Sequence, residues 1–219
     1  MLGGSSSING MVYIRGQAQD YDHWAQLGNR GWGWPDVLPV FKRMERCDGG
    51  SDQYRGRNGP LRVTDTPRHK VPLLEKMIEA AEKIGLPFNP DLNGMTQEGI
   101  GMSQVTIAKG RRQSTAYCYL DPARGRRNLV VEQGAMAETL VLEGKRCVGL
   151  RYSVGGEKRE ARALREVIVS AGSINSPKLL ELSGIGKAAF LQRLGIAPVP
   201  ELSGVGENIH EDLIHLTRV

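Results

Sequence analysis

The stretch EVIVSAGSINSPKLLELSGIG, residues 166–186, decides the fold. Its apolar centre, Val167–Val169, does not alternate with polar residues, and this pattern predicts a strand that is covered on both faces. A glycine turn follows, and then Ser176 and Pro177 fit the N-cap and the first position of a helix. A buried strand that turns directly into a helix is typical of an α/β fold.

From the residues alone, two interpretations of this strand–turn–helix unit are equally supported. The unit can be an ordinary structural element of an α/β domain. It can also bind a cofactor, because open α/β sheets bind ligands beyond the carboxyl ends of their strands, where helix N–H groups point. The sequence of the unit does not distinguish the structural interpretation from the cofactor-binding one.

A run of strands is predicted upstream of this unit. Apolar segments occur at 128–133, 138–144 and 147–154, and the charged stretch 157–165 follows them. Apolar residues alternate with glycine and polar residues over 147–154, which predicts one buried face. These segments and the helices around them predict a mixed α/β (α+β) chain.

Helices are predicted at five places. The clearest is 71–84, where an apolar stripe repeats at helical spacing and a glycine follows as a stop. The others lie at 35–47, 114–120, 177–182 and 187–194. Residues 20–34 are rich in tryptophan and glycine without clear periodicity, so they are expected to form an irregular covering loop.

A glycine–serine loop near the start of the chain, residues 3–10 (GGSSSING), is the second candidate site. Paired glycines let a backbone approach a bulky ligand, and successive N–H groups can cradle an anion. A string of this kind is also typical of a flexible linker. The apolar segment at 11–14 that follows it favours the interpretation as a ligand loop.

Composition excludes several classes of protein. The 219 residues are 40% hydrophobic and 24% charged, as in ordinary globular proteins. The net charge of +5 is mostly scattered, with a basic pair at Arg111–Arg112 and a basic group at Arg124–Arg127. It is expected to form a solvated surface, which can also favour an anionic cofactor, whereas a nucleic-acid binder would concentrate its charge. No membrane span, signal peptide, disulfide framework or zinc spacing is seen. The three separated cysteines fit a reducing, cytoplasmic compartment; these are Cys47, Cys118 and Cys147.

Two long segments carry a family resemblance. LGGSSSINGMVYIRG (2–16) and GSINSPKLLELSGIG (172–186) resemble the two signature regions of the glucose–methanol–choline oxidoreductases. The intervening segments at 89–101 and 110–131 also resemble the family, in the same order. The resemblance therefore covers essentially the whole chain, and choline dehydrogenase-like members and related bacterial alcohol dehydrogenases are the most similar.

The resemblance implies a Rossmann-like FAD-binding domain that is interrupted by a substrate-binding domain. By this comparison, residues 1–61 are a segment of the FAD domain with its lid. Residues 62–125 form part of the substrate-binding domain, and residues 126–219 are the second part of the FAD domain. The chain is expected to be an internal piece of a longer enzyme.

The resemblance also implies an activity and a cofactor. Family members oxidise a CH–OH group and transfer the hydride to flavin N5. Ile8 stands where some relatives carry a histidine that is covalently joined to FAD, so the FAD is expected to be non-covalent. Residues at the family's cofactor-binding positions are Gly4, Ser5, Asn9, Gly10, Val12, Ala137, Ala171 and Gly172.

Two functional parts of the family pattern fall outside these residues by the same comparison. One is the strand with its G-x-G-x-x-G turn, and the other is the catalytic histidine, expected beyond Val219. No catalytic residue is assigned within the chain, and its four histidines are expected to be surface or structural residues; they are His23, His69, His210 and His215.

Several alternatives stay open at this stage. The chain can be a flavin-free remnant or a binding module, and in isolation it is expected to bind FAD weakly and to turn over no alcohol. The identity of the alcohol, the choice between dehydrogenase and oxidase, and the oligomeric state are not determined. A nucleic-acid-binding function rests only on the pI of about 9.2 and has no motif to support it.

Overall fold

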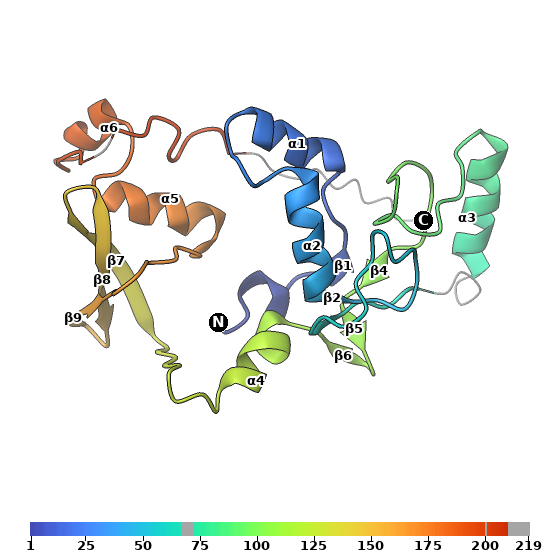
Figure 1. Ribbon diagram of the computed structural model, residues 1–219, viewed down its shortest axis with the longest axis horizontal. Coiled ribbons are helices and arrows are strands. Elements are labelled where there is room, and N and C mark those ends of the chain that lie inside the picture. Colours follow the sequence, from blue (N-terminus) through green and yellow to red (C-terminus); the bar gives the residue numbers. More distant parts are fainter. Residues whose placement is uncertain (67–71, 200, 210–219) are drawn as a thin grey trace. The chain divides into compact units, whose positions relative to one another are not determined.

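The computed structural model describes residues 1–66, 72–199 and 201–209. The chain divides into two compact units, Met1–Leu129 and Val130–Val219, which are blue to green and yellow to red in Figure 1. Each unit is considered by itself. The domain boundaries expected after residues 61 and 125 stay predictions.

The first unit combines helices with short two-stranded pairs. The predicted helices at 35–47 and 71–84 are confirmed as α2 (Trp34–Met44) and α3 (Pro72–Lys83). Strand β1 (Val12–Tyr13) pairs with β4 (Gln104–Val105), and β2 (Glu45–Arg46) pairs with β3 (Leu61–Arg62), so segments far apart in sequence are joined. The remaining elements are η1 (Gly4–Ser7), β5 (Ile107–Ala108), β6 (Arg111–Arg112), a π-helix at Ala116–Leu120 and α4 (Asp121–Ala123).

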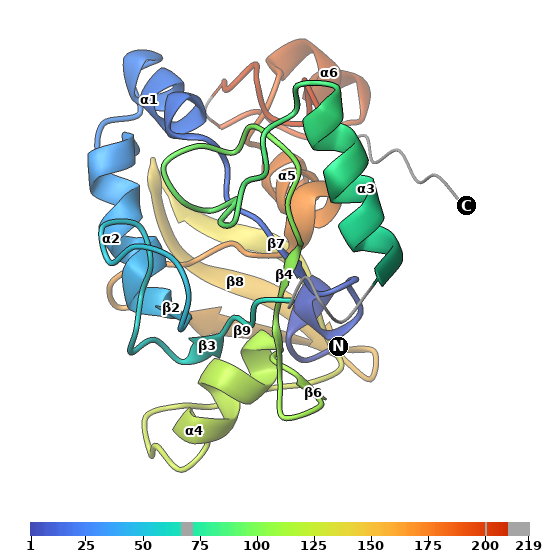
Figure 2. The ribbon, with the colours of Figure 1, turned by 90° about the vertical axis from the view of Figure 1, so that its right-hand side faces the viewer.

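The expectation of an irregular loop at 20–34 is wrong in its first part, because residues Ala18–Gln26 form helix α1. The Gln17 N–H donates to Asp20 Oδ2 at 2.8 Å and so caps the first turn. Tyr21 packs its ring against Trp34, with centroids 5.7 Å apart, and this contact joins α1 to α2. The two helices lie side by side in Figure 1 and Figure 2. Aromatic packing, rather than a simple apolar stripe, stabilises this helix.

The second unit is built on an antiparallel sheet. The strands predicted at 138–144 and 147–154 are confirmed as β7 (Ala135–Glu143) and β8 (Arg146–Val154). The charged stretch supplies the third strand, β9 (Glu157–Arg162), whose residues are all exposed. Helix α5 (Gly172–Leu182) packs against β7 (Figure 2), and α6 (Ala188–Arg193) follows it.

The prediction of a strand at 167–169 is not confirmed. Residues 163–171 contain no strand, and the Ile168 side chain is 79% exposed. A strand requires a hydrogen-bonded neighbour, and within the described residues none pairs with this segment. The segment 128–133, also predicted as a strand, is likewise unpaired.

The predicted helix start is also wrong. Helix α5 begins at Gly172, so Ser176 and Pro177 lie inside it rather than at its N-cap and first position. Ser176 still stabilises the turn before the helix, because its Oγ accepts a hydrogen bond from the Ala171 N–H at 3.0 Å. The mixed helix and strand content agrees with the predicted fold class. No helix among the described residues has the length and apolar character that a membrane crossing requires.

Candidate functional site

The glycine–serine loop, residues 3–10, is folded and is not a linker. Gly3 and Gly4 have φ of 86° and 52°, in the left-handed region that glycine adopts without strain. Gly3 precedes the 3₁₀ turn η1 and Gly4 is its first residue, and after this turn the Asn9 N–H donates to the Ser5 carbonyl at 2.8 Å. Two residues that sequence reasoning did not single out, Arg112 and Thr115, hold the loop from the protein side.

The outer side of the loop presents polar groups beside an apolar surface. Ile8 is 70% exposed and Val12 58% exposed, next to the exposed residues Asn9 and Gly10. Within the described residues, Ser5 Oγ and the Gly10 N–H have no hydrogen-bond partner. An apolar surface with a few unpaired polar groups is the usual lining of a small-molecule site.

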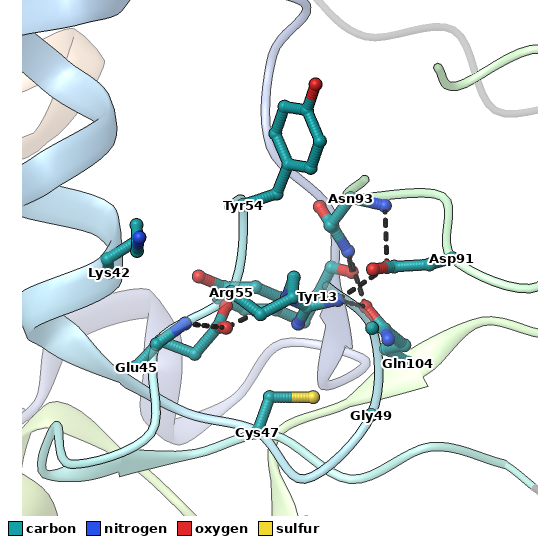
Figure 3. Close-up of polar contacts among 12 residues, drawn as sticks. Tyr13, Lys42, Glu45, Cys47, Gly49, Tyr54, Arg55, Asp91, Asn93 and Gln104 are labelled. Atoms are coloured by element: carbon teal, nitrogen blue, oxygen red, sulfur yellow. Dashed lines mark hydrogen bonds and ion pairs between the residues drawn. The ribbon is translucent and has the colours of Figure 1, made fainter. Parts of the chain in front are cut away.

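A buried ion-pair network lies beneath strand β1 and fixes the segment that continues from the loop (Figure 3). Glu45 is fully buried and receives Arg15 Nη2 at 2.7 Å and Arg55 Nε at 2.9 Å. Burial alone would raise the pKa of the Glu45 carboxyl, but the Arg55 hydrogen bond and the two arginine charges outweigh it and lower the pKa. Glu45 is therefore an anion that neutralises two buried cations.

The network extends to the segment 89–104. Arg55 Nη1 contacts Asp91 Oδ1 at 2.5 Å and donates to Gln104 Oε1 at 2.7 Å. Asn93 accepts from the Arg15 N–H at 2.7 Å, which joins the strand after the loop to the same segment. Burial, partly offset by the charge of Arg15, raises the pKa of the Tyr13 phenol to about 12. Three segments distant in sequence are thereby held as one scaffold behind the loop.

A second candidate surface lies in the other unit. Ala137 on β7 and Ala171, just before α5, line one cavity of about 220 Å³. Asn175, Lys178 and Leu182 on α5 complete most of its wall. The cavity combines apolar walls with a lysine and an amide side chain, and these groups suit an aromatic ring that carries polar edges.

The predicted cofactor residues thus fall into two local groups. Gly4, Ser5, Asn9, Gly10 and Val12 lie together in the first unit, on the loop and on β1. In the second unit, Ala137 and Ala171 share one cavity, and Gly172 follows directly as the first residue of α5 with φ of 91°. Whether these residues contact a cofactor stays a prediction.

The remaining candidates form no site. His23 is an exposed residue of α1, whereas His69, His210 and His215 lie outside the described residues. Among the described residues, no cluster of histidine, cysteine and acidic side chains is suited to hold a metal ion. Cys47, Cys118 and Cys147 are free thiols.

The fold and its two candidate surfaces agree with a family assignment. The model of the GMC oxidoreductase family matches residues 1–214, so the chain belongs to this family. The resemblance seen in the sequence is therefore confirmed, including its extent over nearly the whole chain.

Particular relatives are similar over almost the same length. Oxygen-dependent choline dehydrogenase of Brucella anthropi is 51% identical over 213 residues, which are 97% of this chain and 38% of that protein. Pyridoxine 4-oxidase from Mesorbium loti has a TM-score of 0.83 and 33% identity over 90% of this chain and 39% of its own. An FAD-dependent oxidoreductase from Chaetomium thermophilum has a TM-score of 0.83 and 30% identity, covering 91% and 37%. The chain therefore spans less than half the length of these relatives.

Proposed function

We propose that this chain is the cofactor-binding part of an FAD-dependent oxidoreductase that converts a small alcohol to an aldehyde or ketone. The observation that carries the proposal is the exposed glycine–serine loop, where unpaired polar groups lie beside Ile8 and Val12 within a segment of the matched family. Bound FAD supplies the hydride acceptor for the CH–OH carbon. The residues described here bind and orient that acceptor.

The residues present fit a flavin dinucleotide in chemistry. A flavin ring is broad and apolar on its faces and polar on its edges, and the loop offers both kinds of surface. Ser5 Oγ and the Gly10 N–H are available as hydrogen-bond groups, since no described residue pairs with them. In the second unit, the cavity of about 220 Å³ at Ala137 and Ala171 offers a separate surface for an adenine ring.

The proposed attachment of FAD is non-covalent. Ile8 has no nucleophilic atom, so it cannot form a bond to the flavin ring. Denaturation of the complete protein with acid is expected to release all of the flavin into the supernatant. Flavin that stays with the precipitated protein would contradict this part of the proposal.

The substrate class follows from the relatives. Curated relatives at about half identity are choline dehydrogenases, so choline is the first alcohol to test.

The free thiols support a reducing, cytoplasmic location.

The test uses the complete protein that contains this chain. It is purified, its flavin content is measured, and choline and other primary alcohols are added without oxygen. The proposal predicts one flavin per chain and bleaching of the visible flavin absorption by an alcohol. A folded complete protein that holds no flavin would refute the proposal and would favour a flavin-free binding module.

A further inference from the structure

One arginine converges on the glycine–serine loop from a strand that is distant in sequence. Arg112, on β6, donates from Nη1 to the Asn9 carbonyl oxygen and to Asn9 Oδ1, each at 2.7 Å. The same nitrogen lies 3.2 Å from the carbonyl oxygen of Ser6. Asn9 Oδ1 also accepts from the Met11 N–H at 3.1 Å, so the arginine and the backbone hold this side chain from two directions.

A threonine anchors the other end of the loop. Thr115 Oγ1 donates to the Gly3 carbonyl oxygen at 3.1 Å, and the Thr115 N–H donates to Ser6 Oγ at 2.9 Å. Gly3 approaches the backbone here so closely that a Cβ on it would lie 3.3 Å from the Ala116 nitrogen. Residues 112–116 therefore hold both ends of the loop through its inner side.

These contacts occupy only the inner side of the loop. Ser5, Ile8 and Gly10 are exposed and make none of these contacts. The carbonyls of Ser6 and Asn9 would otherwise depend on water, since a loop this short has few internal hydrogen-bond donors. The planar, permanently charged guanidinium satisfies both carbonyls from one position and so fixes where Asn9 and Gly10 lie.

We propose that Arg112, assisted by Thr115, is a positioning residue that holds the glycine–serine loop in the conformation that binds FAD. This inference rests on the proposed function, because it takes the loop to be the flavin-binding surface. Arg112 acts through Asn9 and through the loop backbone. It also keeps an unneutralised positive charge at the loop, because no carboxylate among the described residues pairs with it.

A neighbouring arginine provides a matched control. Arg111 precedes Arg112 on β6, but its guanidinium lies over the Tyr117 ring, 3.9 Å from the centroid, and among the described residues no hydrogen bond or ion pair joins it to the loop. Replacing either arginine with methionine removes the same charge and a similar volume. A difference between the two variants therefore reports the loop contacts rather than the general electrostatic field.

The experiment measures the dissociation constant for FAD of the complete protein, after the flavin has been removed, by titration with FAD. The loss of charge-assisted hydrogen bonds predicts that Arg112→Met binds FAD about 10- to 100-fold more weakly than wild type. Arg111→Met should bind within about twofold of wild type. Arg112→Lys, which keeps the charge but ends nearer the backbone, should fall between wild type and Arg112→Met.

A second readout separates positioning from simple loss of folding. In a double-mutant cycle, Asn9→Ala and Arg112→Met together should weaken FAD binding by less than the sum of the two single changes, because both remove the contact between Arg112 Nη1 and Asn9 Oδ1. Equal FAD affinity in wild type and Arg112→Met would overturn the inference. If Arg112→Met does not fold, Arg112→Lys decides: weaker binding by about threefold or more supports the inference, and unchanged affinity overturns it. If folded wild type binds no FAD, the proposed function itself has failed.

Discussion

Replacing Glu45 with glutamine should loosen the scaffold behind the glycine–serine loop. The side chain is completely buried and accepts three hydrogen bonds, from Arg15, from Arg55 and from the Gly56 N–H at 3.0 Å. Glutamine keeps the shape but removes the negative charge, so two buried guanidinium groups lose their common counter-ion. Breaking a buried pair from one side costs about 3–5 kcal/mol.

Hydrogen exchange of the complete protein, resolved by peptide, measures this local effect. A loss of about 3–5 kcal/mol corresponds to exchange faster by about a hundredfold to several thousandfold, if the opening is at equilibrium. Peptides that cover 10–16, 45–57 and 89–105 should respond together, because the network joins these three segments. Glu143→Gln on β7 serves as the control, since its carboxylate is 65% exposed in its pair with Arg162.

The control should leave exchange unchanged in every peptide. Protection in Glu45→Gln that stays within about tenfold of wild type would contradict this prediction, since it would mean that the two arginines are solvated or compensated elsewhere. Faster exchange in only one of the three segments would refute the claim that the network holds them as one scaffold.

Three further predictions follow from the same structure. Because folding lowers the pKa of Glu45, the stabilisation that its carboxylate contributes is complete above its pKa in the unfolded chain, about 4.3, and is lost as pH falls through its pKa in the folded protein. Urea unfolding should therefore show a loss of stability at low pH that Glu45→Gln lacks. Gly184→Ala should destabilise the second unit by about 1–3 kcal/mol, because φ is 83° and the new Cβ would lie 2.6 Å from the Ala197 carbonyl oxygen; unchanged exchange there would contradict this. Ser183→Ala removes the Oγ that accepts from the Leu140 N–H at 2.8 Å, so the second unit should lose about 1–2 kcal/mol of stability. Hydrogen exchange at β7 should become faster, and unchanged exchange there would contradict the prediction.

Local patterns made part of the fold predictable from sequence. Helix α3 follows from its apolar stripe, and β7 and β8 follow from β-branched and alternating residues. Helix α1 was missed because its helical signal is a capping contact of Asp20 together with an aromatic spacing, Tyr21 and Trp24, whose rings lie 5.4 Å apart. Those two features are the signal that could have identified it.

The prediction of a strand at 167–169 was wrong for a different reason. Apolar β-branched residues favour a strand, but a strand exists only where a neighbour pairs with it, and no local pattern supplies that neighbour. The helix after it begins at Gly172, with φ of 91°, four residues before the capping signal at Ser176.

The candidate site was predictable only in part. The glycine–serine loop was a candidate site from its own residues, whereas the pair Ala137 and Ala171 came from a family resemblance. The residues that hold the loop did not, because Arg112 contacts Asn9 across 103 positions of sequence and was noted only as part of a basic pair. The ion-pair network was missed for the same reason, since Arg15 and Glu45 are 30 residues apart.

The decisive measurement is a crystal structure of the complete protein purified with its cofactor. We expect an FAD molecule whose flavin half contacts the glycine–serine loop at Ser5, Asn9 or Gly10. A folded protein without FAD, or with FAD that does not touch this loop, would contradict the proposed function.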